Sequence, residues 1–233
     1  MASTITSHIP SASSPRATRH IRGEVCGPCP VREKCLKWAL DNNEVYGIWW
    51  SPRPDGSVRL MSSLSEDGGA TWANAVPVDT TDRGHRGCAR PPAAVAADSA
   101  SGYVHVVYYV EGPDGPGLFF SHSMERGMLY HEPVPVVYGR GPVSAAVASD
   151  GNTVVVAYED PNTQRPRIGL QISRTMGHLF EERMPVISSG NAASSEPRVA
   201  VRGRTLAVGW TERPTGSRAD EPGVPVVRVG EIR

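Results

Sequence analysis

Ser65-Glu66-Asp67-Gly68-Gly69-Ala70-Thr71-Trp72 has the composition of a tight β-turn closed by its own side chains. The Ser65 and Asp67 oxygens can accept hydrogen bonds from N–H groups of the turn, and Gly69 can adopt a positive φ. Burial of the Trp72 ring would anchor the loop. We therefore predict that Ser65, Asp67, Gly69 and Trp72 are structural residues.

The same eight-residue frame recurs at residues 123–130 and 173–180. Each copy keeps a serine at its first position, a glycine at its fifth and an aromatic residue at its eighth. An apolar-Pro-Val triplet follows each copy at the same offset, at residues 76–78, 134–136 and 184–186. This agreement indicates an internal repeat.

Hairpin patterns surround each copy of the frame, because short apolar runs alternate with Asn-, Asp- or Gly-containing turns. The first two expected strands of each repeat are residues 36–40 and 45–50, 93–98 and 103–109, 145–150 and 153–158, and 197–201 and 206–210. The expected third strands are residues 58–63, 117–121, 167–172 and 224–229. Four antiparallel strands in about 50 residues have the size of a propeller blade.

The Ser-x-Asp-x-Gly-x-Thr-Trp frame resembles the Asp box, or BNR repeat, of sialidases and related β-propellers. Over about residues 36–233, the resemblance implies an all-β propeller of about four antiparallel four-stranded blades. The expected blades are residues 36–82, 88–138, 140–189 and 195–233, the last without its fourth strand. A disordered tail (residues 1–21) and a cysteine-bearing leader (residues 22–35) would precede them.

Asp-box propellers usually have more blades than four, so two arrangements remain open. An N-terminal segment could close a compact ring by pairing with the last blade. Otherwise an open blade edge remains, which favours self-association with another chain.

The bulk composition narrows the classes of partner. The chain has 233 residues with 24 basic and 24 acidic side chains, so its overall charge does not indicate binding to nucleic acid. The sequence contains no run of 18 apolar residues, so it predicts no membrane-spanning helix. The first 20 residues lack the apolar core of a secretory signal. A cytoplasmic location is the expectation for the chain as written.

Three of the four cysteines, Cys26, Cys29 and Cys35, form a Cys-x2-Cys-x5-Cys motif. Together with Gly47-Ile48-Trp49, this motif resembles the WhiB-like iron–sulfur regulators of actinobacteria, over residues 22–49. That family holds a [4Fe–4S] cluster with four cysteines, but no cysteine precedes Cys26 here. We expect no cofactor, with an iron–sulfur cluster or zinc at the three cysteines as the alternative, completed by Cys88 or an outside ligand.

The residues after Cys35 support two local structures. Lys, Leu, Ala and Trp favour a helix over residues 33–42, whereas the repeat predicts a strand over residues 36–40. The two interpretations exclude each other.

Charged residues of both signs follow the second and fourth strands of the repeats, which places them on the blade face opposite the Ser65–Trp72 turn. They are Arg53, Glu111, Glu159, Asp160 and Glu212 after second strands, and His85, Arg86, Arg90, Arg140 and Glu196 between blades. Such a face suits a polar or anionic ligand such as a sugar acid. It would equally suit a solvated rim of weak ion pairs.

The functional expectation is a non-catalytic propeller that binds a glycan, a peptide or a protein. Arg90-Pro91-Pro92 resembles the Arg-Ile-Pro motif of sialidases, but no other sialidase catalytic residue matches. A sialidase-like glycoside hydrolase and a WhiB-like metal-binding regulator are the alternatives. His105, His122, His131 and His178 show no metal-ligand spacing, so we expect surface or packed residues.

Overall fold

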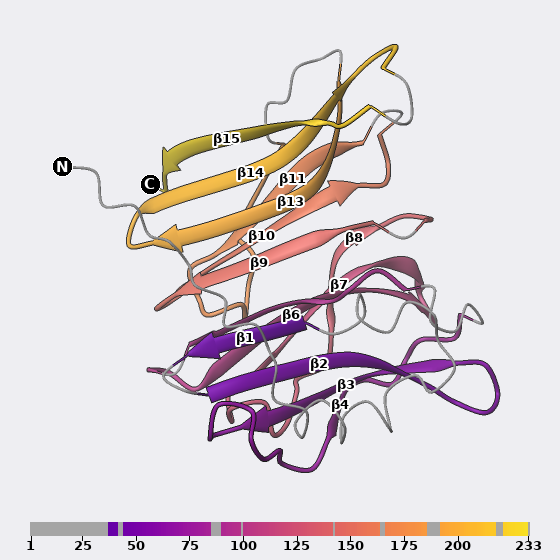
Figure 1. The fold of residues 1–233 in the computed structure, drawn as a ribbon, viewed down its shortest axis with the longest axis vertical. Helices are drawn as coiled ribbons and strands as arrows, with labels where there is room; N and C mark the ends of the chain where they lie inside the picture. Colours follow the sequence, from indigo (N-terminus) through magenta and orange to yellow (C-terminus); the bar gives the residue numbers. More distant parts are fainter. Residues whose placement is uncertain are drawn as a thin grey trace.

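The computed structural model describes residues 37–41, 44–84, 90–98, 100–141, 143–163, 166–185, 192–217 and 221–232. These residues form fifteen strands in four sheets, and within each sheet the strands lie in chain order. Neighbouring strands are antiparallel, and the sheets follow one another along the long axis of the molecule (Figure 1). The all-β prediction is confirmed.

The strand bounds are close to those expected from the repeat. The first sheet holds β1 (Lys37–Asp41), β2 (Glu44–Pro52), β3 (Val58–Ser65) and β4 (Val76–Asp79). The second holds β5 (Ala94–Asp98), β6 (Tyr103–Gly112), β7 (Gly115–Ser123) and β8 (Val134–Tyr138). The third holds β9 (Ala145–Asp150), β10 (Thr153–Asp160), β11 (Arg167–Ser173) and β12 (Glu182–Pro185). The fourth holds β13 (Ala192–Arg202), β14 (Thr205–Pro214) and β15 (Val224–Glu231).

Of the two local structures weighed for the segment after the cysteines, the structure shows the strand where it describes the chain, and the helix alternative for residues 33–42 is wrong there. β1 pairs with β2 from Lys37↔Ile48 to Asp41↔Glu44. Pairing with a neighbouring strand therefore overrides the weak local helix preference of these residues. The tail and the leader, residues 1–21 and 22–35, lie outside the described residues.

Apolar side chains between successive sheets form the core. Tyr46 and Trp50 of β2 pack against the second sheet, and the Trp50 and Tyr108 ring centroids lie 6.4 Å apart. Phe120 and Tyr158 belong to the next cluster along the chain. Central strands β2, β6 and β10 are therefore buried in almost continuous runs, as expected for strands covered on both faces.

The four sheets form an open arc rather than a closed ring in the described part of the chain. The innermost strands β1, β5, β9 and β13 contact one another in series. No comparable packing joins the described strands of the first and fourth sheets, which lie at opposite ends of the molecule in Figure 1. The fourth sheet has three described strands, with β15 at its edge. The N-terminal segment that could close the ring lies outside the described residues, so both arrangements stay predictions.

No described helix is long and apolar enough to cross a membrane.

Candidate functional site

The Ser65–Trp72 turn is closed by side-chain hydrogen bonds. Gly69 N donates to Ser65 Oγ at 2.8 Å and has a φ of 95°. Thr71 donates to Asp67 through its N and its Oγ1, at 2.8 and 2.7 Å. These donors, with Ser65, lower the pKa of Asp67 to about 2. All of these bonds are internal to the turn, and the half-buried Trp72 packs beside it.

The opposite ends of the strands carry an open depression of about 570 Å³ between the first two sheets. The loop after β2, the connection from β4 to β5 and the loop after β6 supply its walls. The lining residues are Arg53, Asp55, Ser57, Thr80, Thr81, Asp82, Arg83 and Pro113. The depression therefore contains exposed groups of both charges.

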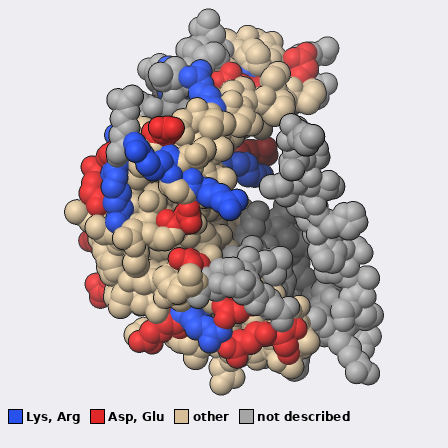
Figure 2. All heavy atoms as spheres, turned by 90° about the vertical axis from the view of Figure 1, so that its left-hand side faces the viewer, with Lys and Arg blue, Asp and Glu red and all other residues tan. Residues whose placement is uncertain are grey.

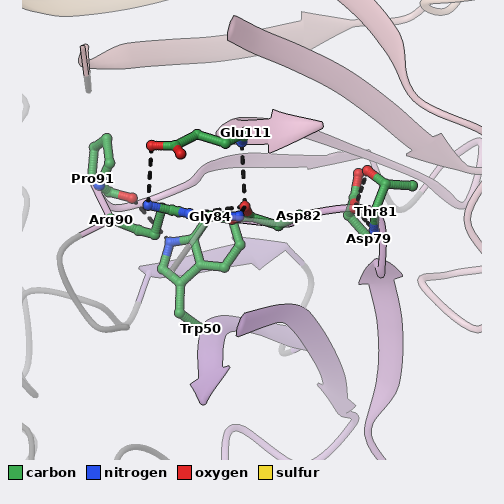
Figure 3. Close-up of polar contacts among 8 residues, drawn as sticks. All are labelled: Trp50, Asp79, Thr81, Asp82, Gly84, Arg90, Pro91 and Glu111. Carbon is green, nitrogen blue, oxygen red and sulfur yellow. Dashed lines mark hydrogen bonds and ion pairs between the residues drawn. The ribbon is translucent and has the colours of Figure 1, made fainter. Parts of the chain in front are cut away.

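A buried ion pair lies at the edge of this depression (Figure 3). Arg90 donates from Nε and Nη2 to the two carboxylate oxygens of Asp82, at 2.7 and 2.8 Å. Arg90 Nη1 lies 3.8 Å from Glu111 Oε1, and the Glu111 side chain is 29% exposed whereas that of Arg90 is fully buried. Burial alone would lower the pKa of Arg90, but the hydrogen bonds and charge of Asp82 outweigh it, so the pKa is raised.

The local sequence explains how three charged groups can approach so closely. Gly84 N donates to Asp82 Oδ1 at 2.9 Å, and Arg83 N donates to the Glu111 carbonyl at 3.0 Å. A Cβ on Gly84 would lie 2.1 Å from Arg90 Nη2 and 2.8 Å from Glu111 Oε2. Position 84 therefore requires glycine.

A second buried carboxylate supports the same connection. Tyr108 Oη donates to Asp79 Oδ2 at 2.8 Å, and Thr81 donates to Asp79 Oδ1 from both N and Oγ1. Burial, followed by the charge of Asp79, raises the pKa of Tyr108 well above its usual value. Trp50 Nε1 donates to the Pro91 carbonyl at 3.0 Å and so ties the segment after Arg90 to the first sheet (Figure 3).

Other predicted site residues form a separate group between the third and fourth sheets. The Glu159 carboxylate accepts from Ser144 N at 3.2 Å and from Glu196 N at 2.8 Å. Glu212 accepts from Trp210 Nε1 at 3.0 Å. Glu159 of β10 thus links the segment before β9 to β13, whereas the Glu212 bond stays within β14.

The structure thus brings together only part of the predicted face. Arg53, Arg90 and Glu111 lie in or beside the depression, whereas Glu159, Glu196 and Glu212 belong to the other group. Asp160 accepts from Asn162 N in a local turn, and Arg140 is exposed. His85, Arg86 and Cys88 lie outside the described residues.

Sequence reasoning missed Asp55, Asp79, Asp82, Arg83 and Tyr108. Asp79 and Asp82 follow directly after the Val76-Pro77-Val78 triplet, on a connection where two aspartates within four residues were a usable signal.

Among the described residues, no group of His, Cys, Asp and Glu is arranged to hold a metal ion. The predicted ligands Cys26, Cys29 and Cys35 lie outside the described residues.

The N-terminal part of the chain and the region of the four sheets resemble different known proteins. The family Transcription factor WhiB matches residues 7–52. Over 25 residues, the chain is 64% identical to the transcriptional regulator WhiB2 of Bifidobacterium longum, which covers 11% of this chain and 25% of that protein. The likeness is therefore confined to the N-terminal part, and β1 and β2 overlap its end.

Solved structures resemble the sheet region. The Hadza microbial sialidase Hz136 superposes with a TM-score of 0.57 and 15% identity, over 84% of this chain and 44% of that one. A Dyadobacter fermentans protein of unknown function superposes with a TM-score of 0.61 and 16% identity, over 83% of this chain and 52% of that one. A GH43_12 protein from a capybara gut metagenome superposes with a TM-score of 0.53 and 11% identity, over 84% of this chain and 39% of that one. The fold is that of a β-propeller. This chain spans about half or less of each of these proteins, and its four sheets correspond to blades.

The prediction of a non-catalytic binding propeller is wrong in the light of these neighbours. It rested on missing catalytic motifs, but the known structures that share the fold include a sialidase and a member of GH43. Short motifs are a poor test in this fold, because a propeller site collects single residues from several blades. The hydrolase alternative is the one that these comparisons favour.

Proposed function

We propose that this chain carries the substrate-binding face of a glycoside hydrolase built on a β-propeller. The observation that carries the proposal is the partly exposed carboxylate of Glu111, which lies 3.8 Å from the buried Arg90 at the edge of the depression. The fold shared with a sialidase supports it.

Glycoside hydrolysis normally needs two carboxyl groups, one to protonate the leaving oxygen and one to assist attack at the anomeric carbon. Glu111 is the proposed catalytic carboxylate at the end of β6, because it is accessible and is held there by its backbone bond to Arg83. Asp55, in the loop after β2, is the proposed second carboxylate, which activates the attacking water. Asp82 is unsuited to either role, because its side chain is 1% exposed and binds Arg90 with both oxygens.

The two arginines that line the depression, Arg53 and Arg83, are the proposed ligands of a negatively charged group on the glycan. Guanidinium groups bind carboxylates through paired, charge-assisted hydrogen bonds. The Ser65–Trp72 turn is the proposed Asp box, supported by the hydrogen bonds from Gly69 to Ser65 and from Thr71 to Asp67. Its role here is structural.

The experiment is turnover of a panel of 4-methylumbelliferyl sialosides and neutral glycosides by the wild-type chain and by Glu111→Gln. Loss of this carboxylate is expected to lower kcat by about 10²- to 10⁴-fold on the best substrate. Glu132→Gln is the matched control, because Glu132 is an exposed glutamate after the turn of residues 123–130 (the second-sheet turn), away from the depression. A folded wild-type chain without turnover of any substrate, or full activity in Glu111→Gln, would contradict the proposal.

A second proposal concerns the N-terminal part alone. The match of residues 7–52 to the WhiB family supports an iron–sulfur cluster or zinc bound by Cys26, Cys29 and Cys35. Its test is anaerobic purification with metal analysis of the wild type and of Cys29→Ser. Stoichiometric metal that is lost in Cys29→Ser is expected, and a metal-free wild type would refute the proposal.

A further inference from the structure

The four histidines in the described part of the chain gather at the contact between the second and third sheets. His105 lies on β6 and His122 on β7. His131 follows the second-sheet turn, and His178 lies in the turn of residues 173–180, which we call the third-sheet turn. The His122 ring lies 4.6 Å from His131 in a stacked arrangement and 4.6 Å from His178 in an edge arrangement. We call these four residues the histidine cluster.

Tyr103 joins the cluster to the third sheet. Its ring stacks on His105 and His122 at 5.7 Å, and its hydroxyl lies 3.1 Å from His178 Nε2. His178 is exposed and belongs to the turn of residues 173–180, so a polar contact and an edge contact both connect this turn to the second sheet.

The four histidine rings differ in their exposure to solvent. His131 and His178 are exposed, whereas His105 is 1% and His122 is 6% exposed. His105 Nδ1 and His122 Nε2 are buried without a hydrogen-bond partner in the part of the chain that the structure describes. A proton added at either nitrogen would create a buried charge without an acceptor, unless the site opened.

The third-sheet turn covers the buried rings. The Cβ position of Gly177 lies 2.5 Å from Phe120 Cζ and 3.6 Å from His105 Nδ1, so the turn backbone rests on these two rings. Separation of the turn from β6 and β7 would therefore expose His105 and His122 to water.

We propose that the histidine cluster is a proton-operated latch between the second and third sheets. Neutral rings hold the third-sheet turn in place, and proton uptake by His105 and His122 releases it. The latch is independent of the proposed glycoside hydrolysis and lies on the opposite face from the depression.

The direction of the pH dependence follows from burial. Burial lowers the pKa of His105 to about 3 and that of His122 to about 4, and the neighbouring histidines add to both shifts. An exposed histidine has a pKa of about 6.5, so the open form binds protons more readily than the closed form. The closed turn is therefore fully stable above about pH 6.5 and loses stability as the pH falls toward 4.

Several other charged groups face the cluster or the turn. Asp98 acts on His105 in the opposite direction, because its charge favours the protonated ring. In the turn itself, Arg174 N donates to Glu181, and the Arg174 guanidinium binds Glu182 at 2.7 Å. Carboxylates with ordinary pKa values stay ionised between pH 7.5 and 5.0, which makes this interval specific for histidine.

The test is hydrogen–deuterium exchange of the full chain between pH 7.5 and 5.0, with rates corrected for intrinsic exchange. Protection of residues 174–180 is expected to fall below pH 6.5, by about tenfold per pH unit for each histidine coupled to opening. The Ser65–Trp72 turn is the internal control, since no described histidine contacts it.

Two variants separate proton uptake from ordinary packing. His122→Phe keeps an aromatic ring at the centre of the cluster, but this ring cannot be protonated. We therefore expect a smaller slope of protection against pH for residues 174–180. His178→Phe removes the polar contact with Tyr103, so protection of residues 174–180 is expected to fall at every pH, while the slope from His105 and His122 remains. Constant protection of residues 174–180 in the wild type, or an unchanged slope in His122→Phe, would overturn the proposal.

Discussion

Arg90 shows how one residue can organise the candidate site. Its side chain is fully buried, yet it binds Asp82 with two hydrogen bonds and lies beside Glu111. A buried charge with good geometry adds little net stability over an apolar residue, but the loss of one partner leaves the other charge uncompensated. The ion pair therefore positions Glu111 at the cost of sensitivity to mutation.

Arg90→Met is expected to lower the free energy of unfolding by about 3–5 kcal/mol, because Asp82 would stay buried without its cation. The double variant Asp82→Leu/Arg90→Met should be less destabilised than Arg90→Met alone, which urea unfolding at pH 7 can measure. Arg174→Met, which breaks a partly exposed pair with Glu182, is the control and should cost about 1 kcal/mol or less. Additive effects of the two site substitutions would contradict this account.

At the scale of single elements, the three repeated turns share one device. In each, the glycine N–H donates to the serine Oγ four residues earlier: Gly69 to Ser65, Gly127 to Ser123 and Gly177 to Ser173. The second and third turns also rest on an aromatic ring of the preceding sheet. Gly127 approaches Tyr46, and Gly177 approaches Phe120. The turns therefore couple neighbouring sheets as well as neighbouring strands.

Gly177→Ala is expected to be more destabilising than Gly151→Ala, although both glycines have a positive φ, of 88° and 54°. The added methyl group at position 177 would overlap Phe120, whereas nothing lies within 4 Å of the corresponding position at Gly151. Overpacking costs typically about 1–3 kcal/mol, in addition to the backbone strain at a positive φ. Thermal unfolding of the two variants measures the difference, and equal losses would show that Phe120 moves aside.

Much of this element-level structure was predictable from the sequence, because it depends on residues close together in the chain. The two strands of the β9–β10 hairpin and the serine-to-glycine turns could be recognised locally. The secondary structure of the β1 segment was ambiguous, because the residue types over 33–42 also favour a helix. Only pairing with β2 resolves the choice between helix and strand. Asp82 and Arg90 escaped recognition as a pair, because nothing in the sequence shows that their side chains are buried together.

At the scale of the whole molecule, the described strands form an open arc in which β15 is an edge strand of the fourth sheet. β15 pairs with β14, and no described strand pairs with its other side. Val227 and Val229 are 67% and 69% exposed on this strand. Acidic and basic side chains are interspersed on the described surface of the face shown in Figure 2. The edge remains the proposed site of self-association.

We expect a concentration-dependent dimer, measured by sedimentation velocity, that Val227→Lys weakens by about tenfold or more, because a charge on an edge strand opposes pairing. Leu129→Lys is the control, because Leu129 is 62% exposed in the second-sheet turn, away from β15. A chain that is monomeric at all concentrations, or equal weakening by both substitutions, would exclude pairing through this edge.

The sequence by itself determined the repeat, the all-β class and most strand bounds, because alternating apolar residues and turn chemistry act over a few neighbouring positions. Tertiary structure alone decided the contact of Asp82 and Arg90 with Glu111, the gathering of histidines from residues 105 to 178, and the open arc. The physical reason is that these features depend on how the sheets pack against one another. Packing brings distant residues together and sets their burial, and no local pattern in the chain encodes either.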